Sequence, residues 1–150
     1  MMTDDLKKIH RKLAVDCFNA TWDLLDKKDR TEDDNFRMIH TAHASRFHWG
    51  ETGTSLELQR GEWQISRVYS VLGLGESALH HAQYCHDICK EKGIGDFDMA
   101  FACEALARAH HALDNSRKRD IFIKMAKVAS ESIEDTGNKE YFLKELSSVN

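Results

Sequence analysis

Residues 54–89 read TSLELQRGEWQISRVYSVLGLGESALHHAQYCHDIC and contain the signals of a complete helix pair. Thr54 followed by Glu57 is a capping box, which predicts that a helix begins here. The glycine-containing segment 73–75 predicts a turn. Apolar residues then recur at helical spacing over 76–92. The stretch therefore predicts two antiparallel helices joined by a short turn.

The same helical periodicity continues on both sides of this stretch, whereas the two-residue alternation of strands is nowhere sustained. The chain also lacks proline, which suits helices joined by short turns. We therefore expect one all-α domain over residues 1–150, an array of three antiparallel helix hairpins plus a C-terminal capping helix. The expected hairpins span about 4–50, 54–93 and 96–137, with a sixth helix reaching about 136 and the capping helix over 138–149.

Two finer expectations follow from this pattern. Gly50, Gly93 and Gly137 each follow an expected helix end, where a left-handed C-cap favours glycine. They lie 43 and 44 residues apart, and a near-constant period of this size is typical of stacked hairpins. The first helix carries an apolar stripe that we expect to be buried. The stripe consists of Leu6, Ile9, Leu13, Cys17, Ala20 and Leu24.

The composition limits the classes of function. The formal net charge is −4, which argues against a general nucleic-acid binder because phosphate binding needs a basic face. No apolar run approaches the ~18 residues that a membrane-spanning helix needs. The N-terminal residues resemble no signal peptide. We therefore expect a cytoplasmic protein with no nucleic-acid or membrane partner, and with its four cysteines as free thiols.

The segment 69–73, Tyr-Ser-Val-Leu-Gly, followed by Ala78, Ala82 and Cys85, resembles the core of a tetratricopeptide repeat. In that family an aromatic residue precedes a Leu-Gly turn, and small residues on the second helix allow close packing. The resemblance covers about 30–134 at the level of the superfamily, with a longer period than the family's repeat of about 34 residues. It implies a right-handed array of hairpins whose first helices line a concave face.

Several polar residues fall on the apolar faces of the expected helices. A buried arginine is costly unless it is paired, so Arg46 predicts an acidic partner from another helix. Glu104 precedes Arg108 by four residues, the favoured orientation for an ion pair. One hypothesis is that these residues converge in a groove that holds a carboxylate or phosphate. The alternative is that they form ion pairs that bridge neighbouring hairpins. The full set is His43, Arg46, Glu62, Ser66, Glu104 and Arg108.

Together these patterns predict a binding or adaptor module that recognises a peptide segment or a small anionic ligand on its concave face. Trp63 and Arg67 are the expected anchors, because aromatic and arginine side chains dominate binding energies at interfaces. A protein or peptide partner is expected, a homodimer is left open, and no catalytic residue and no cofactor are assigned. The expected site residues are Arg46, Glu62, Trp63, Ser66, Arg67, Glu104 and Arg108.

Two other classes of function stay open. A metal-dependent helical-bundle enzyme would need His43, His81 and either His110 or His111 within reach of one metal ion. The chain has none of the sequence motifs typical of such sites, and we assign no metal ligand. A structural homo-oligomerisation domain would need an uncovered apolar patch. The first helix offers one at Phe18, Trp22 and Leu25.

Overall fold

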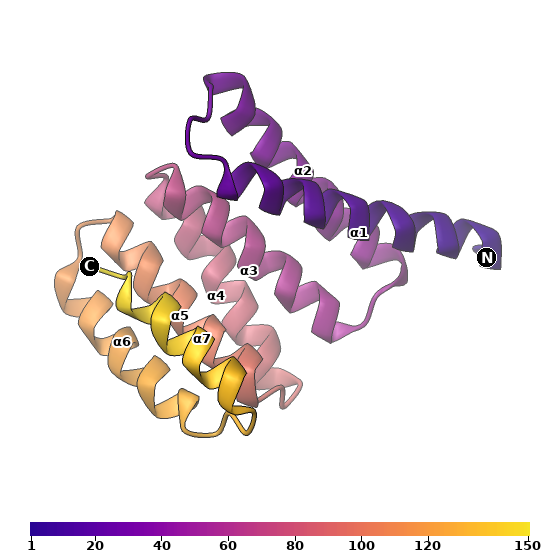
Figure 1. The fold of residues 1–150 in the computed structure, drawn as a ribbon. Coiled ribbons are helices and arrows are strands. Elements are labelled where there is room, and N and C mark those ends of the chain that lie inside the picture. The colour runs from indigo at the N-terminus through magenta and orange to yellow at the C-terminus, as the bar shows by residue number, and fades with distance from the viewer.

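The computed structural model describes all residues 1–150 and contains seven helices and no strand (Figure 1). Consecutive helices pack as three antiparallel hairpins, and the seventh helix lies against the last hairpin. The expected all-α array of three hairpins and a closing helix is confirmed. The helices are α1 (Asp4–Asp26), α2 (Glu32–Thr52), α3 (Ser55–Val71), α4 (Gly75–Glu91), α5 (Asp96–Ala112), α6 (Ser116–Ser130) and α7 (Thr136–Ser147).

Local capping chemistry places the starts of the first three helices. The Thr3 hydroxyl caps α1 by accepting a hydrogen bond from the backbone N–H of Leu6, at 3.2 Å. Thr31 and Asp34 form a reciprocal capping box at the start of α2. At the start of α3, the Thr54 backbone N–H donates to a carboxylate oxygen of Glu57, at 2.9 Å. Each cap satisfies N–H groups that have no partner within the helix, and the cap of α3 confirms the sequence prediction.

The end of α2 differs from the expected one. Gly93 follows α4 in the left-handed region, with φ of +64°, as predicted for a C-cap glycine. Gly50 instead lies inside α2, which continues to Thr52. The chain becomes extended at Gly53, with φ of −87° and ψ of 176°, directly before the cap of α3. The expected helix end at Gly50 is therefore wrong.

The connection between α6 and α7 also differs. α6 ends at Ser130, and Ile133 in the connection is buried in the core. Asp135 then caps α7 by accepting a hydrogen bond from the backbone N–H of Asn138, at 2.7 Å. Gly137 consequently falls in the first turn of α7 and is not the C-cap glycine that the sequence predicts. The spacings of 43 and 44 residues between the three glycines do not connect equivalent positions.

α5 is the central helix of the domain, as its apolar sequence predicts. Ala105, Leu106 and Ala109 on α5 pack against Ala78 and Ala82 on α4. These small side chains let the two helices approach closely and so join the second hairpin to the third.

The four cysteines are free thiols.

α7 covers the apolar side of the third hairpin (Figure 1). Phe142, Leu146 and Val149 are buried in one cluster with Ala107 of α5 and Ala126 of α6. Phe142 is fully buried. The closing helix is therefore part of the core. Its side chains that point away from this cluster lie at the surface of the domain.

α1 does not bury the whole of its predicted apolar stripe. Ala14 and Thr21 are the buried residues of this helix, whereas Leu6, Ile9 and Leu13 are 42%, 53% and 39% exposed. The expectation fails because α1 ends the array and packs chiefly against α2, so that its remaining faces have no neighbouring helix. α1 is also the longest helix, with 23 residues. Neither α1 nor any other helix of the structure is both long enough and apolar enough to cross a membrane.

Candidate binding site

An aromatic pocket lies where side chains of α1, α3, α5 and α7 meet. We call the surface that these four helices form around the pocket the inner face. The volume of the pocket is about 260 Å³. Three of these helices are the first helices of the hairpins, the ones the sequence expects to line a binding face. Nine residues line the pocket: Phe18, Trp22, Gln59, Arg60, Trp63, Phe97, Asp98, Phe101 and Tyr141.

The aromatic rings of the pocket hold one another in place. Trp63 lies 5.6 Å from Trp22 and 5.5 Å from Phe101, measured between ring centroids. Phe97 lies 4.6 Å from Phe101, and Tyr141 lies 6.0 Å from it. These tilted and edge-to-face arrangements are the favourable ones for aromatic pairs. The pocket walls therefore come from four helices and are packed against one another before any ligand is bound.

The polar residues of the pocket are arranged around Asp98. The Arg60 guanidinium donates to both carboxylate oxygens of Asp98, at 2.9 and 3.1 Å. The side-chain amide of Gln59 donates to the same carboxylate at 2.6 Å, and the Cys85 thiol donates to the Gln59 carbonyl oxygen at 3.5 Å. The Asp98 carboxylate is almost buried, whereas about half of the Arg60 side chain is exposed. The Arg60 guanidinium therefore lies at the rim of the pocket, where the nearly buried Asp98 carboxylate holds it.

A second, smaller pocket adjoins the first one along α1. It has a volume of about 190 Å³ and shares Phe18 and Arg60 with the aromatic pocket. Its other lining residues are Val15, Trp49 and Glu57. The two pockets are therefore adjacent, with Phe18 of α1 and Arg60 of α3 in the wall of both.

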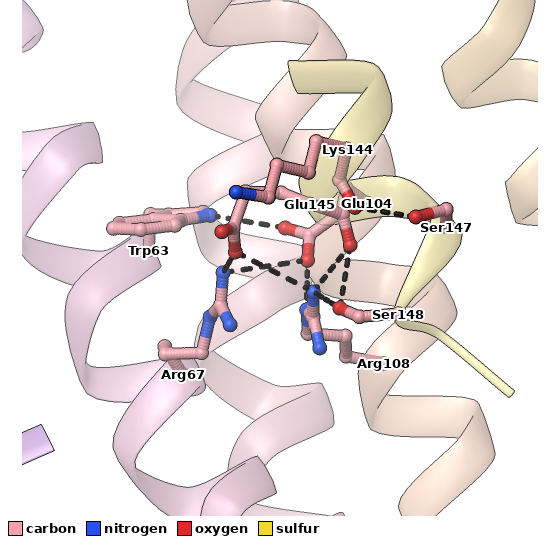
Figure 2. A network of polar contacts seen from close by, with 8 residues as sticks. All are labelled: Trp63, Arg67, Glu104, Arg108, Lys144, Glu145, Ser147 and Ser148. Atoms are coloured by element: carbon pink, nitrogen blue, oxygen red, sulfur yellow. Dashed lines mark hydrogen bonds and ion pairs between the residues drawn. The ribbon is translucent and has the colours of Figure 1, made fainter. Parts of the chain in front are cut away.

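A network of charged side chains lies next to Trp63 and joins α3, α5 and α7 (Figure 2). The indole N–H of Trp63 donates to a carboxylate oxygen of Glu104 at 3.4 Å, and the Arg67 guanidinium lies over the Trp63 ring, 5.5 Å from its centroid. Arg67 also donates to the Glu145 carboxylate at 2.8 Å. Arg108 contacts Glu104 and donates to the Glu145 backbone carbonyl at 2.8 Å. The expected Glu104–Arg108 ion pair is confirmed.

The Glu104 carboxylate is the centre of this network. Its side chain is fully buried, and both Arg67 and Arg108 lie against it (Figure 2). A buried carboxylate is tolerated only when cations and hydrogen-bond donors surround it. The two guanidiniums and the carboxylates of Glu104 and Glu145 balance in charge, so the network fixes Trp63 and Arg67 in place without a net charge.

The six polar residues expected in one groove divide into two groups on different sides of α3. Arg46 of α2 meets Glu62 of α3, with 3.2 Å between Nε and Oε1, which confirms the predicted acidic partner. His81 of α4 contacts the other oxygen of Glu62 at 2.7 Å. His43 of α2 contacts the Tyr69 hydroxyl at 2.8 Å. This group bridges the first two hairpins, and none of its members lines the aromatic pocket.

Ser66 borders the group of Glu104 and Arg108, but its buried hydroxyl donates to the Ala78 carbonyl of α4 at 2.8 Å. Among the expected site residues, Trp63 lines the pocket, and Arg67, Glu104 and Arg108 form the network behind it. Arg46, Glu62 and Ser66 hold α3 against its neighbours instead. The convergence fails because Glu62 meets residues of α2 and α4, whereas Glu104 lies on the side of α3 that carries Trp63 and Arg67.

The three histidines considered as metal ligands do not all lie together. His43 and His81 are neighbours, with ring centroids 5.4 Å apart, and burial lowers the pKa of His43 with a further lowering from His81. His110 stacks on Phe122 of α6, at 5.4 Å between ring centroids. No group of three or more histidine, cysteine, aspartate or glutamate side chains is positioned to hold a metal ion.

Most of the pocket was not predicted as a site. Phe97 and Phe101 flank the polar stripe of α5, and Phe18 and Trp22 were assigned to a possible dimer surface. The available signal was a pair of aromatic residues four apart, on one face of α1 and again on one face of α5. Tyr141, Arg60 and Asp98 carried no such signal, because their role depends on how the hairpins stack.

Comparison of the chain with protein-family models, with curated proteins and with solved structures found no match. The geometry of the inner face is therefore the basis for a function.

Proposed function

We propose that the chain is a recognition module of the tetratricopeptide-like kind, which binds a peptide segment along the inner face. The observation that carries the proposal is the aromatic pocket, where six aromatic side chains from four helices leave a cavity of about 260 Å³. Aromatic and arginine side chains supply most of the binding energy at protein interfaces. The pocket is large enough for one amino-acid side chain, which would serve as the anchor of the peptide.

The arrangement of charges supports a peptide as the ligand. Arg60 lines both pockets, and Asp98 accepts hydrogen bonds from the Nε and Nη2 atoms of its guanidinium. A guanidinium has five N–H donors, so Arg60 retains donors for the backbone carbonyls or a carboxylate of a bound peptide. The network around Glu104 holds Trp63 in position in advance, which reduces the entropy lost on binding.

A selection from a random twelve-residue peptide library displayed on phage tests this proposal. We expect the peptides that bind the full chain to share one anchor position. Tyr141→Ala should then weaken their binding by about tenfold, as expected for a contact worth roughly 1–2 kcal/mol. The control is Tyr84→Ala on α4, since Tyr84 and Tyr141 are both 48% exposed. Equal losses in the two variants, or no enriched peptide, would contradict a peptide site on the inner face.

A second candidate function is homodimerisation through the N-terminal half of α1. Phe18 and Trp22 of the originally expected surface line the aromatic pocket, and Leu25 packs against the cluster around Met38. The uncovered apolar side chains are Leu6, Ile9 and Leu13, with Phe47 of α2 60% exposed. An apolar patch of this kind is a frequent site of protein association.

Ile9→Lys tests the dimer, because a charge in the middle of the patch would have to be buried in the dimer interface. If α1 mediates self-association, light scattering after gel filtration should give a dimer for the unchanged chain and a monomer for the variant. A monomer at every concentration of the unchanged chain removes this candidate. A dimer that persists in the variant places the interface elsewhere.

A further inference from the structure

The chemistry of the aromatic pocket excludes several kinds of anchor group. An anion would face the negative π-faces of the rings. A neutral hydroxyl or amide would need hydrogen-bond partners inside the pocket. The side chains of Gln59 and Asp98 are already engaged with each other and with Arg60 there, and the N–H donors that Arg60 retains lie at the rim of the pocket. A buried polar group without a partner costs about 1–3 kcal/mol. The groups that remain are an apolar side chain and a cation that carries no N–H donors.

The aromatic walls favour a cation. Cations lie favourably over the faces of tryptophan, tyrosine and phenylalanine, and desolvated sites strengthen the attraction. Trp22 and Trp63 provide two indoles, and Tyr141 closes the side of α7. A quaternary ammonium group suits such walls, because its methyl groups make apolar contacts and it has no hydrogen bond to satisfy.

The charges around the mouth of the pocket agree with this choice. Asp26 is exposed at the end of α1, four residues after Trp22, and Lys27, which follows it, is paired with Asp34. The C-terminal end of a helix adds a partial negative charge. Burial raises the pKa of the Tyr141 hydroxyl, and Glu145 and Asp26 raise it further against an opposing effect of Arg67. Within the pocket, the cationic Arg60 is matched by Asp98.

We propose that the aromatic pocket binds a quaternary methylammonium group, with Trp22, Trp63 and Tyr141 among the aromatic walls that contact it. The inference rests on the proposed function in so far as the group belongs to a peptide, as an Nε-trimethyl-lysine side chain. A free small molecule such as choline carries the same chemistry.

The test is isothermal titration of the full chain with choline and with 3,3-dimethylbutan-1-ol, which has the same shape without the charge. We expect choline to bind at least about tenfold more tightly, a difference of about 1.4 kcal/mol. In the variants Trp22→Leu and Tyr141→Leu, which retain apolar volume but lose a π-face, this preference should fall below about threefold. The control Tyr84→Leu should leave it unchanged. Equal affinities for the two compounds, or no binding of choline, overturn the inference.

Peptides identify the source of the ammonium group. A peptide with Nε-trimethyl-lysine that binds more tightly than choline and than its unmethylated counterpart supports a peptide ligand. Binding of choline without binding of the peptide supports the inference but contradicts the proposed function. Tight binding of library peptides with apolar anchors, together with equal affinities for choline and its neutral isostere, overturns the inference and leaves the proposed function standing.

Discussion

Glu104→Ala is expected to lower the free energy of unfolding by about 3–5 kcal/mol, the usual cost of removing one partner from a buried ion pair. The substitution leaves Arg67 and Arg108 against a cavity, with only Glu145 as a counter-charge. It also removes the acceptor of the Trp63 indole N–H. The loss would be measured by urea denaturation, followed by far-ultraviolet circular dichroism.

Glu140→Ala is the control for this experiment, because Glu140 is an exposed acid on α7 that the structure places outside the network. Its replacement should change the unfolding free energy by less than about 0.5 kcal/mol. If Glu104→Ala costs less than about 1 kcal/mol, the carboxylate does not hold the two arginines as the structure indicates. The network could then not be what positions Trp63 in the pocket.

Phe142→Ala is expected to destabilise the domain by a similar amount, about 3–5 kcal/mol. Phe142 is fully buried in the cluster that joins α7 to α5 and α6, and its ring lies 4.9 Å from that of Phe101. Loss of the side chain removes apolar contacts and leaves a cavity. The same denaturation experiment measures the effect.

Tyr141→Ala provides a control one residue away on the same helix. Tyr141 points to the inner face and is half exposed, so its removal should cost less than about 1 kcal/mol. If Phe142→Ala were as mild as Tyr141→Ala, α7 would be a loosely attached segment and not part of the core. The aromatic pocket would then lack a fixed fourth wall.

The sequence predicted those features that depend on neighbouring residues. The capping residues Thr3, Thr31 and Thr54 act within one turn of their own helix, so their pattern reveals where each helix begins. The ion pair of Glu104 with Arg108 also lies within one helix. The need of Arg46 for an acidic partner follows from the cost of burying a charge, although the sequence did not identify Glu62.

The features that the sequence did not predict depend on how the hairpins stack. Glu62 and Trp63 are adjacent, yet the first contacts Arg46 and the second contacts Glu104, on different sides of α3. Helical projection shows that their directions differ but not which neighbour each one meets. The exposed stripe of Leu6 and Ile9 has the periodicity of a buried face, but α1 has no helix on that side. The aromatic pocket is such a feature, since its walls come from four helices.

The sequence left open whether the polar residues hold a ligand or bridge neighbouring hairpins. The contacts of Arg46, Glu62 and Ser66 hold neighbouring helices together, as the alternative of bridging polar contacts expects. Trp63 connects the aromatic pocket to the charged network on the inner face. Its ring is a wall of the pocket, while its N–H and its face are held by Glu104 and Arg67. The network thus holds Trp63 in a fixed position within the proposed binding surface.

The most direct test of a binding site on the inner face is nuclear magnetic resonance of the chain with a selected library peptide. The chain has three tryptophans, so a nitrogen–proton correlation spectrum contains three indole signals, which Trp→Phe variants would assign. We predict that the signals of Trp22 and Trp63 shift most on titration, and that the signal of Trp49, beside the smaller pocket, shifts less. Peptide binding that leaves the Trp22 and Trp63 signals unmoved would contradict the account.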